Sequence, residues 1–218
     1  MNNYWLHIFF LSLGLSFPAL IGIPGHHAVK PGDIVNGNYQ VQIAEESHLV
    51  INGHTNVNTF SCGYNGNFYP DTLSVNTIAT SGCLRFKNAD IRLKTKLFDC
   101  SNKLMNPDFR NLLKADQYPY IRIKVLEIDK NPGQVKNYLV SNYDRNMLLL
   151  TVEIMIAGQK KIYNLPIEVA DNRDNNFYKG HLKMNIRDFG LTPPRKMLGL
   201  VVVDEMVSID FMIKISVV

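Results

Sequence analysis

Apolar and polar residues alternate strictly in the last stretch of the chain, residues 181–218. In its first part, Leu182, Met184 and Ile186 alternate with polar side chains. Because successive side chains of a strand point to opposite faces, this period of two predicts two strands joined by a loop, each with one buried face. The apolar row of the second part is Val207, Ile209, Phe211, Ile213 and Ile215.

The same alternation recurs along most of the chain. It is loose over residues 38–51 and interrupted by polar residues over 53–62, and we expect one strand in each segment. Eight or so strands with turn residues between them predict an all-β protein, either a sandwich or a closed barrel. The other predicted strands cover residues 73–80, 83–98 (one long or two short), 121–125, 147–157 and 161–169.

One segment has the spacing of a helix. Phe109, Leu112 and Leu113 lie three and four residues apart and form an apolar stripe. Asn106 is predicted to cap the helix, and Pro107 suits the first helical position. We expect this helix, residues 106–116, to lie over the mouth of a sheet or barrel, either as a gate or as a plug.

Length and composition set limits on the function. A chain of 218 residues fits one domain. Its 46% hydrophobic and 19% charged residues exclude a largely disordered chain. The net charge is +4, and the basic residues are spread along the strands instead of gathering in one segment, so no nucleic-acid partner is indicated. A monomer and a homodimer both stay open.

The first residues differ from the rest. Residues 5–23 carry no charged side chain, and prolines and glycines at the end of this run argue against a spanning helix of about 20 residues. We therefore expect a cleaved secretory signal and leader over residues 1–28, with cleavage after Ala19 or Ala28. No stable membrane span is expected after cleavage, and the folded domain is expected over residues 38–218.

The cysteines are Cys62, Cys83 and Cys100. In an exported protein an odd number indicates one disulfide and one free thiol. Their spacing matches no zinc motif, because there is no CxxC pair. Cys83 is interpreted as either a buried inert thiol or a reactive one.

Catalytic motifs are absent from the sequence. It contains no GxSxG and no serine or cysteine with a recognisable base. Asp188-Phe189-Gly190 lacks the glycine-rich loop and HRD segment of a kinase, so we interpret it as a strand end followed by a turn. The histidines have no partner at metal-ligand spacing. The sequence therefore predicts no enzyme, no metal site and no cofactor.

Three segments together resemble the YceI-like, lipocalin-like domain of bacterial exported proteins, in a cysteine-containing branch. The first, residues 105–121, contains the predicted helix. The second is residues 151–161, TVEIMIAGQKK, although Ala157 stands near where many members have arginine. The third is residues 185–190, NIRDFG, with the apolar row that ends at Ile215. Each segment alone is a weak sign of the family, and only the three in this order are specific for it. The resemblance covers the chain from about Tyr39 to its end.

The resemblance implies an antiparallel eight-stranded lipocalin-like barrel with one amphipathic helix near its mouth. It further implies a non-catalytic, exported protein, most readily periplasmic. Its lumen would hold a long apolar ligand: a polyisoprenoid, an isoprenoid quinone or a fatty-acid-like lipid. Within such a barrel, strands ending at Cys62 and Cys100 that run the same way would bring these two sulfurs together as the disulfide.

The candidate lumen residues are apolar side chains that the alternation or the helical stripe places on one face. These side chains either line a cavity or fill a solid core. The alternative function is a cell-envelope binding or assembly module, in which a solid barrel presents loops 63–71 and 171–179. The lumen candidates are Leu93, Leu97, Phe109, Leu112, Leu113, Ile121, Ile123, Leu150, Val152, Ile154, Met184, Ile186, Phe189, Ile209 and Phe211.

Overall fold

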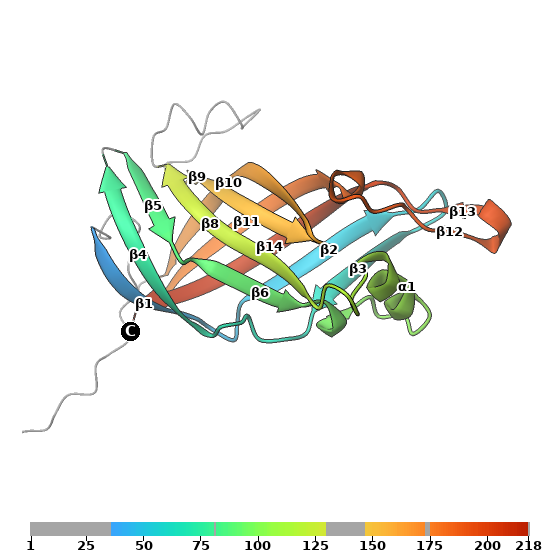
Figure 1. The fold of residues 1–218 in the computed structure, drawn as a ribbon, viewed down its shortest axis with the longest axis horizontal. Helices are drawn as coiled ribbons and strands as arrows, with labels where there is room; N and C mark the ends of the chain where they lie inside the picture. The colour runs from blue at the N-terminus through green and yellow to red at the C-terminus, as the bar shows by residue number, and fades with distance from the viewer. Residues whose placement is uncertain (1–35, 81, 130–146, 173–174, 218) are drawn as a thin grey trace, which may run out of the picture.

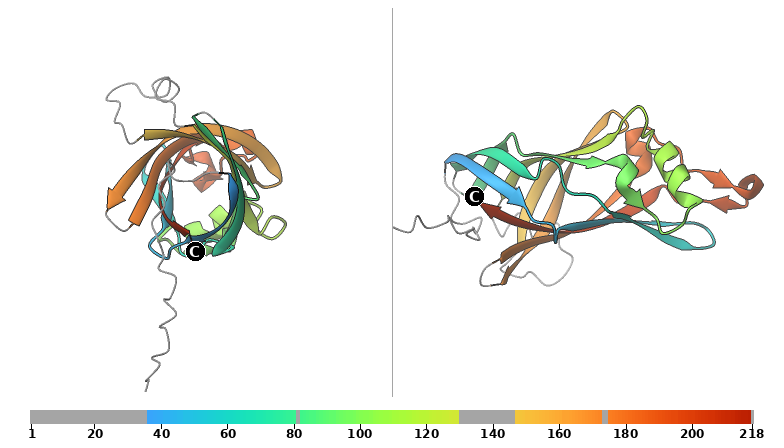
Figure 2. Two further views of the ribbon diagram at one scale, coloured as in Figure 1. Left: turned by 90° about the vertical axis from the view of Figure 1, so that its left-hand side faces the viewer. Right: turned by 90° about the horizontal axis from the view of Figure 1, so that it is seen from below.

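The computed structural model describes residues 36–80, 82–129, 147–172 and 175–217. The predicted signal and leader, residues 1–28, lie outside these ranges. Figure 1 shows an elongated barrel of strands with one helix at one end, and Figure 2 adds a view along the barrel, in which the strands surround the interior.

Eight antiparallel strands form a closed ring. The first strand of the ring pairs with the last, with Val41 opposite Val217, so the ring has no gap at this point. This confirms the predicted all-β barrel. In ring order the strands are β1 (Gly37–Ile43), β4 (Thr72–Thr80), β5 (Cys83–Lys87), β8 (Tyr120–Asp129), β9 (Met147–Ile156), β10 (Gln159–Asn172), β11 (Asn175–Asn185) and β14 (Met206–Val217).

Two positions of the ring are each filled by two successive strands. One half of β14 pairs with β1, and the other half pairs with β2 (His48–His54). In the same way β8 pairs with β5 and then with β6 (Asp90–Lys94), on either side of a register shift after Val125. The long strands β14 and β8 therefore have hydrogen-bonded partners on this side along most of their length.

The first two strand predictions were wrong in their boundaries. Residues 38–51 do not form one strand, because the chain turns at 44–47, where the amide of Ser47 donates to the carbonyl of Ala44. Residues 53–62 do not form one strand either, because residues 53–54 end β2, residues 55–58 form a turn and β3 (Thr59–Tyr64) follows. Thr55 closes this turn, since its hydroxyl oxygen accepts hydrogen bonds from the amides of Val57 and Asn58.

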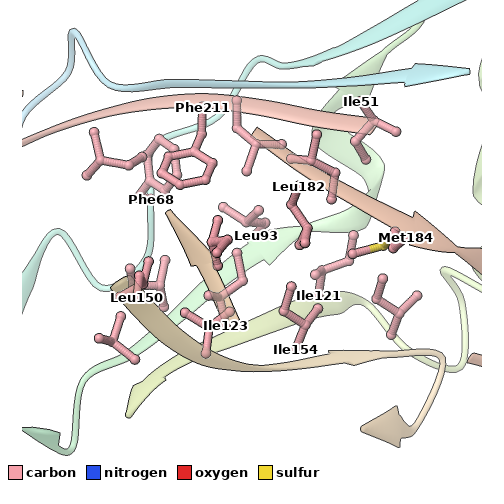
Figure 3. Close-up of a pocket in the computed structure, with 18 of the residues that line it drawn as sticks. Ile51, Phe68, Leu93, Ile121, Ile123, Leu150, Ile154, Leu182, Met184 and Phe211 are labelled. Atoms are coloured by element: carbon pink, nitrogen blue, oxygen red, sulfur yellow. The ribbon is translucent and has the colours of Figure 1, made fainter. Parts of the chain in front are cut away.

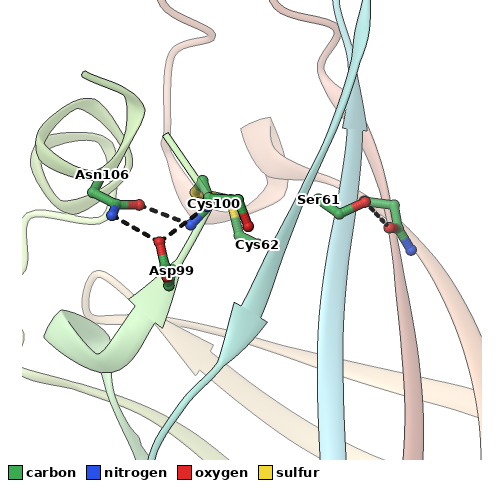
Figure 4. The surroundings of a disulfide bond; sticks show 7 residues. Ser61, Cys62, Asp99, Cys100 and Asn106 are labelled. Atoms are coloured by element: carbon green, nitrogen blue, oxygen red, sulfur yellow. Dashed lines mark hydrogen bonds between the residues drawn. A yellow bond between two sulfur atoms is a disulfide. The ribbon is translucent and has the colours of Figure 1, made fainter. Parts of the chain in front are cut away.

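The helix α1 (Met105–Leu112) lies where the apolar stripe predicted it. It starts one residue earlier than predicted, and Asn106 does not cap it. The amide group of Asn106 instead accepts from the backbone N–H of Cys100 and donates to Asp99, as Figure 4 shows. The hydrogen bond from Asn106, with a second from the backbone of Ser101, holds the pKa of Asp99 below its ordinary value.

Cys62 and Cys100 form the predicted disulfide. The predicted strand direction was wrong: β3 and the short β7 (Phe98–Asp99) are antiparallel neighbours, with Gly63 opposite Asp99. Cys100 directly follows β7, so the two cysteines face each other one position beyond the pair Gly63 and Asp99. A 3₁₀ turn, η1 (Thr95–Leu97), connects β6 to β7. Cys83 is a free cysteine in β5.

The loop between β11 and β14 has its own structure. The 3₁₀ turn η2 (Ile186–Phe189) ends at Gly190, which adopts a left-handed conformation with φ 67°. The DFG segment therefore forms a turn, as predicted, but the strand before it, β11, already ends at Asn185. Beyond it, β12 (Arg195–Lys196), the 3₁₀ turn η3 (Met197–Gly199) and β13 (Val201–Val202) form a small hairpin that projects from the α1 end of the barrel (Figure 1).

Replacing both bonded cysteines, Cys62→Ser with Cys100→Ser, should lower the free energy of unfolding by about 4 kcal/mol, because the bond closes a loop with a sequence separation of 38. Urea denaturation of the double variant and the wild type measures this loss. The control is Cys83→Ser, which should change the value by less than about 0.5 kcal/mol. A loss below about 1 kcal/mol for the double variant would contradict the role given to this bond.

Candidate functional site

The barrel encloses a cavity of about 270 Å³. All eight strands of the ring contribute to its wall, and α1 and η2 contribute at one end. Thirty-nine described residues line it, and all but Tyr178 have side chains without oxygen or nitrogen. Figure 3 shows these apolar side chains pointing inward from opposite walls, with Phe211 and Leu182 facing Ile123 and Ile154. The interior is therefore a hollow, apolar space.

The period of two produces this wall directly. In β14 the alternate residues from Val207 to Val217 all line the cavity. In β9 the same is true of Leu150, Val152, Ile154 and Ile156. The apolar rows that the sequence left open as core or wall therefore form the wall of a cavity.

Two glycines in the wall make room for aromatic rings. Gly180 in β11 stands opposite Phe211 in β14, and a Cβ at Gly180 would lie 2.3 Å from the Phe211 ring. Gly53 and Phe60 have the same relation across β2 and β3. Each ring lies against the backbone of a glycine in the neighbouring strand, so it does not cross the cavity. Sequence reasoning missed these pairs, although a glycine inside a strand pattern was the signal.

Aromatic side chains gather at the α1 end of the cavity. Phe109 of α1 packs on Phe98, with ring centroids 5.5 Å apart, and Phe98 packs on Tyr64 at 5.1 Å. Phe189 of η2 stacks on Tyr163 at 6.4 Å. The helix stripe and the DFG turn thus help to line the same end of the barrel.

Fourteen of the fifteen predicted lumen residues line the cavity. Their contact with a ligand stays a prediction. The placement of Leu97 was wrong: it lies in η1, outside the cavity wall, and is 38% exposed. The strand alternation ends at Lys94, because the chain enters a 3₁₀ turn, where side chains no longer alternate between two faces. Thr95, the first residue of this turn, is buried.

Tyr178 is the only described residue of the lining with a polar side-chain atom. Burial disfavours its phenolate form and raises the pKa of Tyr178 to about 12. Burial also raises the pKa of Tyr163, beside Phe189, to about 12. A phenol is neutral at pH 7 at its ordinary pKa as well as at the raised one, so none of the described lining residues carries a charge.

Charged groups lie on the outer face of the barrel. Arg85 pairs with Glu127 at 2.7 Å, and Arg122 with Asp90 at 2.9 Å. The alternation that turns apolar side chains inward sends these polar neighbours outward.

A ladder of polar side chains crosses β11, β14, β2 and β3. His181 Nδ1 lies 2.6 Å from Asp210 Oδ1, Asn52 donates to the other oxygen of Asp210, and Ser61 donates to Asn52. Sequence spacing could not show this ladder, because its members are far apart in the chain. Ser61 is bonded to Asn52 and not to the histidine, so the ladder is not a serine–histidine catalytic pair.

The described residues contain no group of three or more histidine, cysteine, aspartate or glutamate side chains that could hold a metal ion. No helix in the described ranges has the length and apolar character needed to cross a membrane. Cys83 is partly exposed. Desolvation, together with the carboxylates of Asp129 and Glu127, raises the pKa of its thiol, which lowers the fraction of reactive thiolate at neutral pH.

The raised pKa of Tyr178 predicts a loss of stability in alkaline solution. Because the folded-state pKa of about 12 exceeds the ordinary value of 10, this contribution is full below pH 10 and is lost as the pH rises through 12. Between pH 9 and 11.5 the free energy of unfolding of Tyr178→Phe should fall by about 2 kcal/mol less than that of the wild type. Denaturant titrations at the two pH values measure this difference.

The matched control is Tyr69→Phe, at an exposed tyrosine, which should follow the wild type over the same interval. An unchanged pH dependence for Tyr178→Phe would contradict the burial of this phenol.

The sequence matches no protein-family model and no curated protein. Solved structures do match. BcnA of Burkholderia cenocepacia has a TM-score of 0.55 and 15% identity over 78% of this chain and 96% of that one. A polyisoprenoid-binding domain from Saccharophagus degradans has a TM-score of 0.54 and 12% identity over 82% and 98%. The Campylobacter jejuni YceI protein has a TM-score of 0.46 and 17% identity over 70% of this chain and 84% of that one.

The matches to BcnA and to the Saccharophagus degradans domain cover almost the whole length of those chains. Their sequence identities are low, so the matches show a shared fold alone. The closed ring, the helix at its end and the hollow interior agree with the architecture that the sequence motifs implied. The chain has the lipocalin-like barrel fold of BcnA and of the Saccharophagus degradans domain.

Proposed function

We propose that this protein is an exported, non-catalytic lipocalin-like protein that holds a long apolar ligand in the barrel lumen. The observation that carries the proposal is the cavity itself, which is enclosed by the ring strands and lined by apolar side chains. A solid core would leave no such volume, since protein interiors are close-packed.

The lining favours a slim hydrocarbon chain. Binding would come from apolar area removed from water, at about 25 cal/mol per Å² before the cost of association. Ligand pockets commonly measure about 300–1,000 Å³. A cavity of about 270 Å³ lies just below this range and suits a narrow, extended ligand better than a bulky one.

The proposed ligand classes are a polyisoprenoid, an isoprenoid quinone and a fatty-acid-like lipid. A protein of this fold from Saccharophagus degradans is described as a polyisoprenoid-binding domain, which supports the first class. The uncharged lining suits all three, because each has a long part without charge.

Export to an oxidising compartment, most readily the periplasm, is part of the proposal. The disulfide between Cys62 and Cys100 supports it, because such bonds persist in oxidising compartments. The apolar, uncharged run over residues 5–23 supports it as well, as the core of a secretory signal within residues 1–28. The proposed mature domain covers residues 38–218.

The alternative, an assembly module built on a solid barrel, is less well supported. Its premise of a filled interior does not fit the cavity. Its second contact loop is also shorter than the sequence suggested, because residues 171–172 and 175–179 belong to the paired strands β10 and β11.

The direct test is native mass spectrometry of the protein purified from its natural host, followed by lipid extraction. We expect a mass increment that is lost after extraction and an extract that contains one class of long-chain apolar molecule. Protein of unmodified mass with an extract free of such molecules would contradict the proposal.

Filling the lumen should displace the ligand and leave the fold intact. Ile123→Phe with Leu150→Phe adds volume at two partly buried positions of the cavity wall. We expect affinity for a fluorescent polyene fatty acid to fall about tenfold or more, because the added rings occupy the space of the chain. Fluorescence titration measures this affinity.

The matched control is Ile162→Phe, on the outer face of β10, where the side chain is 63% exposed. This variant should bind the polyene like the wild type. Equal affinity of the lumen-filled variant and the control would place the binding site outside the cavity.

A further inference from the structure

One oxygen-bearing side chain stands among the described residues that line the lumen. Tyr178 belongs to the inward row of β11, together with Leu182 and Met184. It stands opposite Ile213 of β14, which also lines the lumen. The phenol is partly buried, and this burial raises its pKa to about 12. The hydroxyl therefore lies in surroundings that solvate an ion poorly.

A phenol is a costly side chain for an apolar wall. Phenylalanine has almost the same shape and no polar atom, and taking a hydroxyl out of water is unfavourable unless it is hydrogen-bonded. A phenol has one O–H donor and an oxygen that also accepts. Whatever contact Tyr178 makes within the chain, its oxygen has more than one bonding position and can also bind a polar group of a ligand.

Tyr178 lies in the half of the lumen away from α1. The helix lies at the end of the barrel where β14 begins (Figure 1). β14 runs from Met206 to Val217, and Ile213, the residue opposite Tyr178, is nearer to the second of these ends.

The α1 end of the lumen offers only apolar side chains to a ligand. Phe109 and Leu112 of α1 line it, and so do Phe98 and Phe189, which are each 1% exposed. A polar head placed at this end would lose its bonds to water and gain none from the described lining. A ligand with a polar head is therefore better placed with its tail toward α1.

The cations beside Tyr178 belong to the outer face of the barrel. Lys179 follows it in β11 and is exposed. Lys214 follows Ile213 in β14, and its Nζ lies 2.6 Å from Glu46 and 5.8 Å from the centre of the Phe177 ring. Alternation turns both lysines away from the row that lines the lumen. The described lining therefore has no cation for a carboxylate or a phosphate.

We propose that Tyr178 binds an uncharged oxygen-bearing head of the lumen ligand, a hydroxyl or a carbonyl, and that the hydrocarbon tail points toward α1. The inference rests on the proposed lumen binding and names the head group that this binding selects. Among the proposed ligand classes it favours a quinone or an isoprenoid alcohol over an ionised fatty acid, because a buried carboxylate without a cation is costly.

Competition binding tests the role of Tyr178. The reporter is the fluorescent polyene fatty acid, and the competitors are a long-chain primary alcohol and the alkane of the same carbon number. The ratio of alcohol affinity to alkane affinity should be about three- to tenfold lower in Tyr178→Phe than in the wild type, because one hydrogen bond is lost. The ratio cancels any change in how the tail binds.

Two comparisons separate this effect from a change in folding. Tyr178→Phe should keep the alkane affinity of the wild type, since the ring stays in place. The matched control is Tyr163→Phe, at a second phenol whose pKa burial raises but which is outside the described lining. Its affinity ratio should equal that of the wild type.

The charge and the direction of the ligand have tests of their own. At neutral pH the fatty acid of the same carbon number should compete more weakly than the alcohol, because its carboxyl is ionised. An alcohol with a photoreactive diazirine at its tail end should label α1 or η2 on illumination, as peptide mass spectrometry would show.

An equal affinity ratio in Tyr178→Phe and the wild type would overturn the inference. A fatty acid that competes better than the alcohol, or a tail label on residues 213–217, would overturn it as well. In these three cases the polyene still binds, so lumen binding stands. Wild-type protein that binds neither the polyene nor the alcohol would contradict the proposed function, and the inference with it.

Discussion

The structure depends on the register of β14. This strand pairs with β11 along most of its length, with β2 over one half and with β1 over the other, so it closes the ring and joins its two halves. Its alternate side chains from Val207 to Val217 line the cavity. A slip of one residue would turn that row to the outside and the polar row inward, so the apolar pattern itself selects the register.

The packing of the inward side chains leaves the barrel hollow. Large rings lie over glycines, as Phe211 does over Gly180, so they do not cross the space. Charges pair on the outer face, and burial raises the pKa of the phenols of Tyr163 and Tyr178 near the cavity. The interior therefore offers contact with hydrocarbon side chains and no partner for a charge. Because burying an unpaired charge is costly, such a space favours an apolar ligand.

The sequence predicted the parts that follow from local periodicity. The rows of β9 and β14, the helix stripe at Phe109 and the turn at Asp188 lie where the pattern placed them. It failed where an irregular turn ends the period. Leu97 falls in a 3₁₀ turn outside the wall, and Asn106 braces the disulfide segment in place of capping the helix. Contacts between distant segments, such as His181 with Asp210, leave no spacing signal in one sequence.

We propose that the lumen between Phe211 and Ile154 is a binding site and not a packing defect. A crystal structure of the protein purified from its natural host tests this most directly. We expect continuous, elongated density along the cavity, in contact with the side chains of β9 and β14. A lumen in which those side chains have moved together, with no space and no density between them, would contradict it.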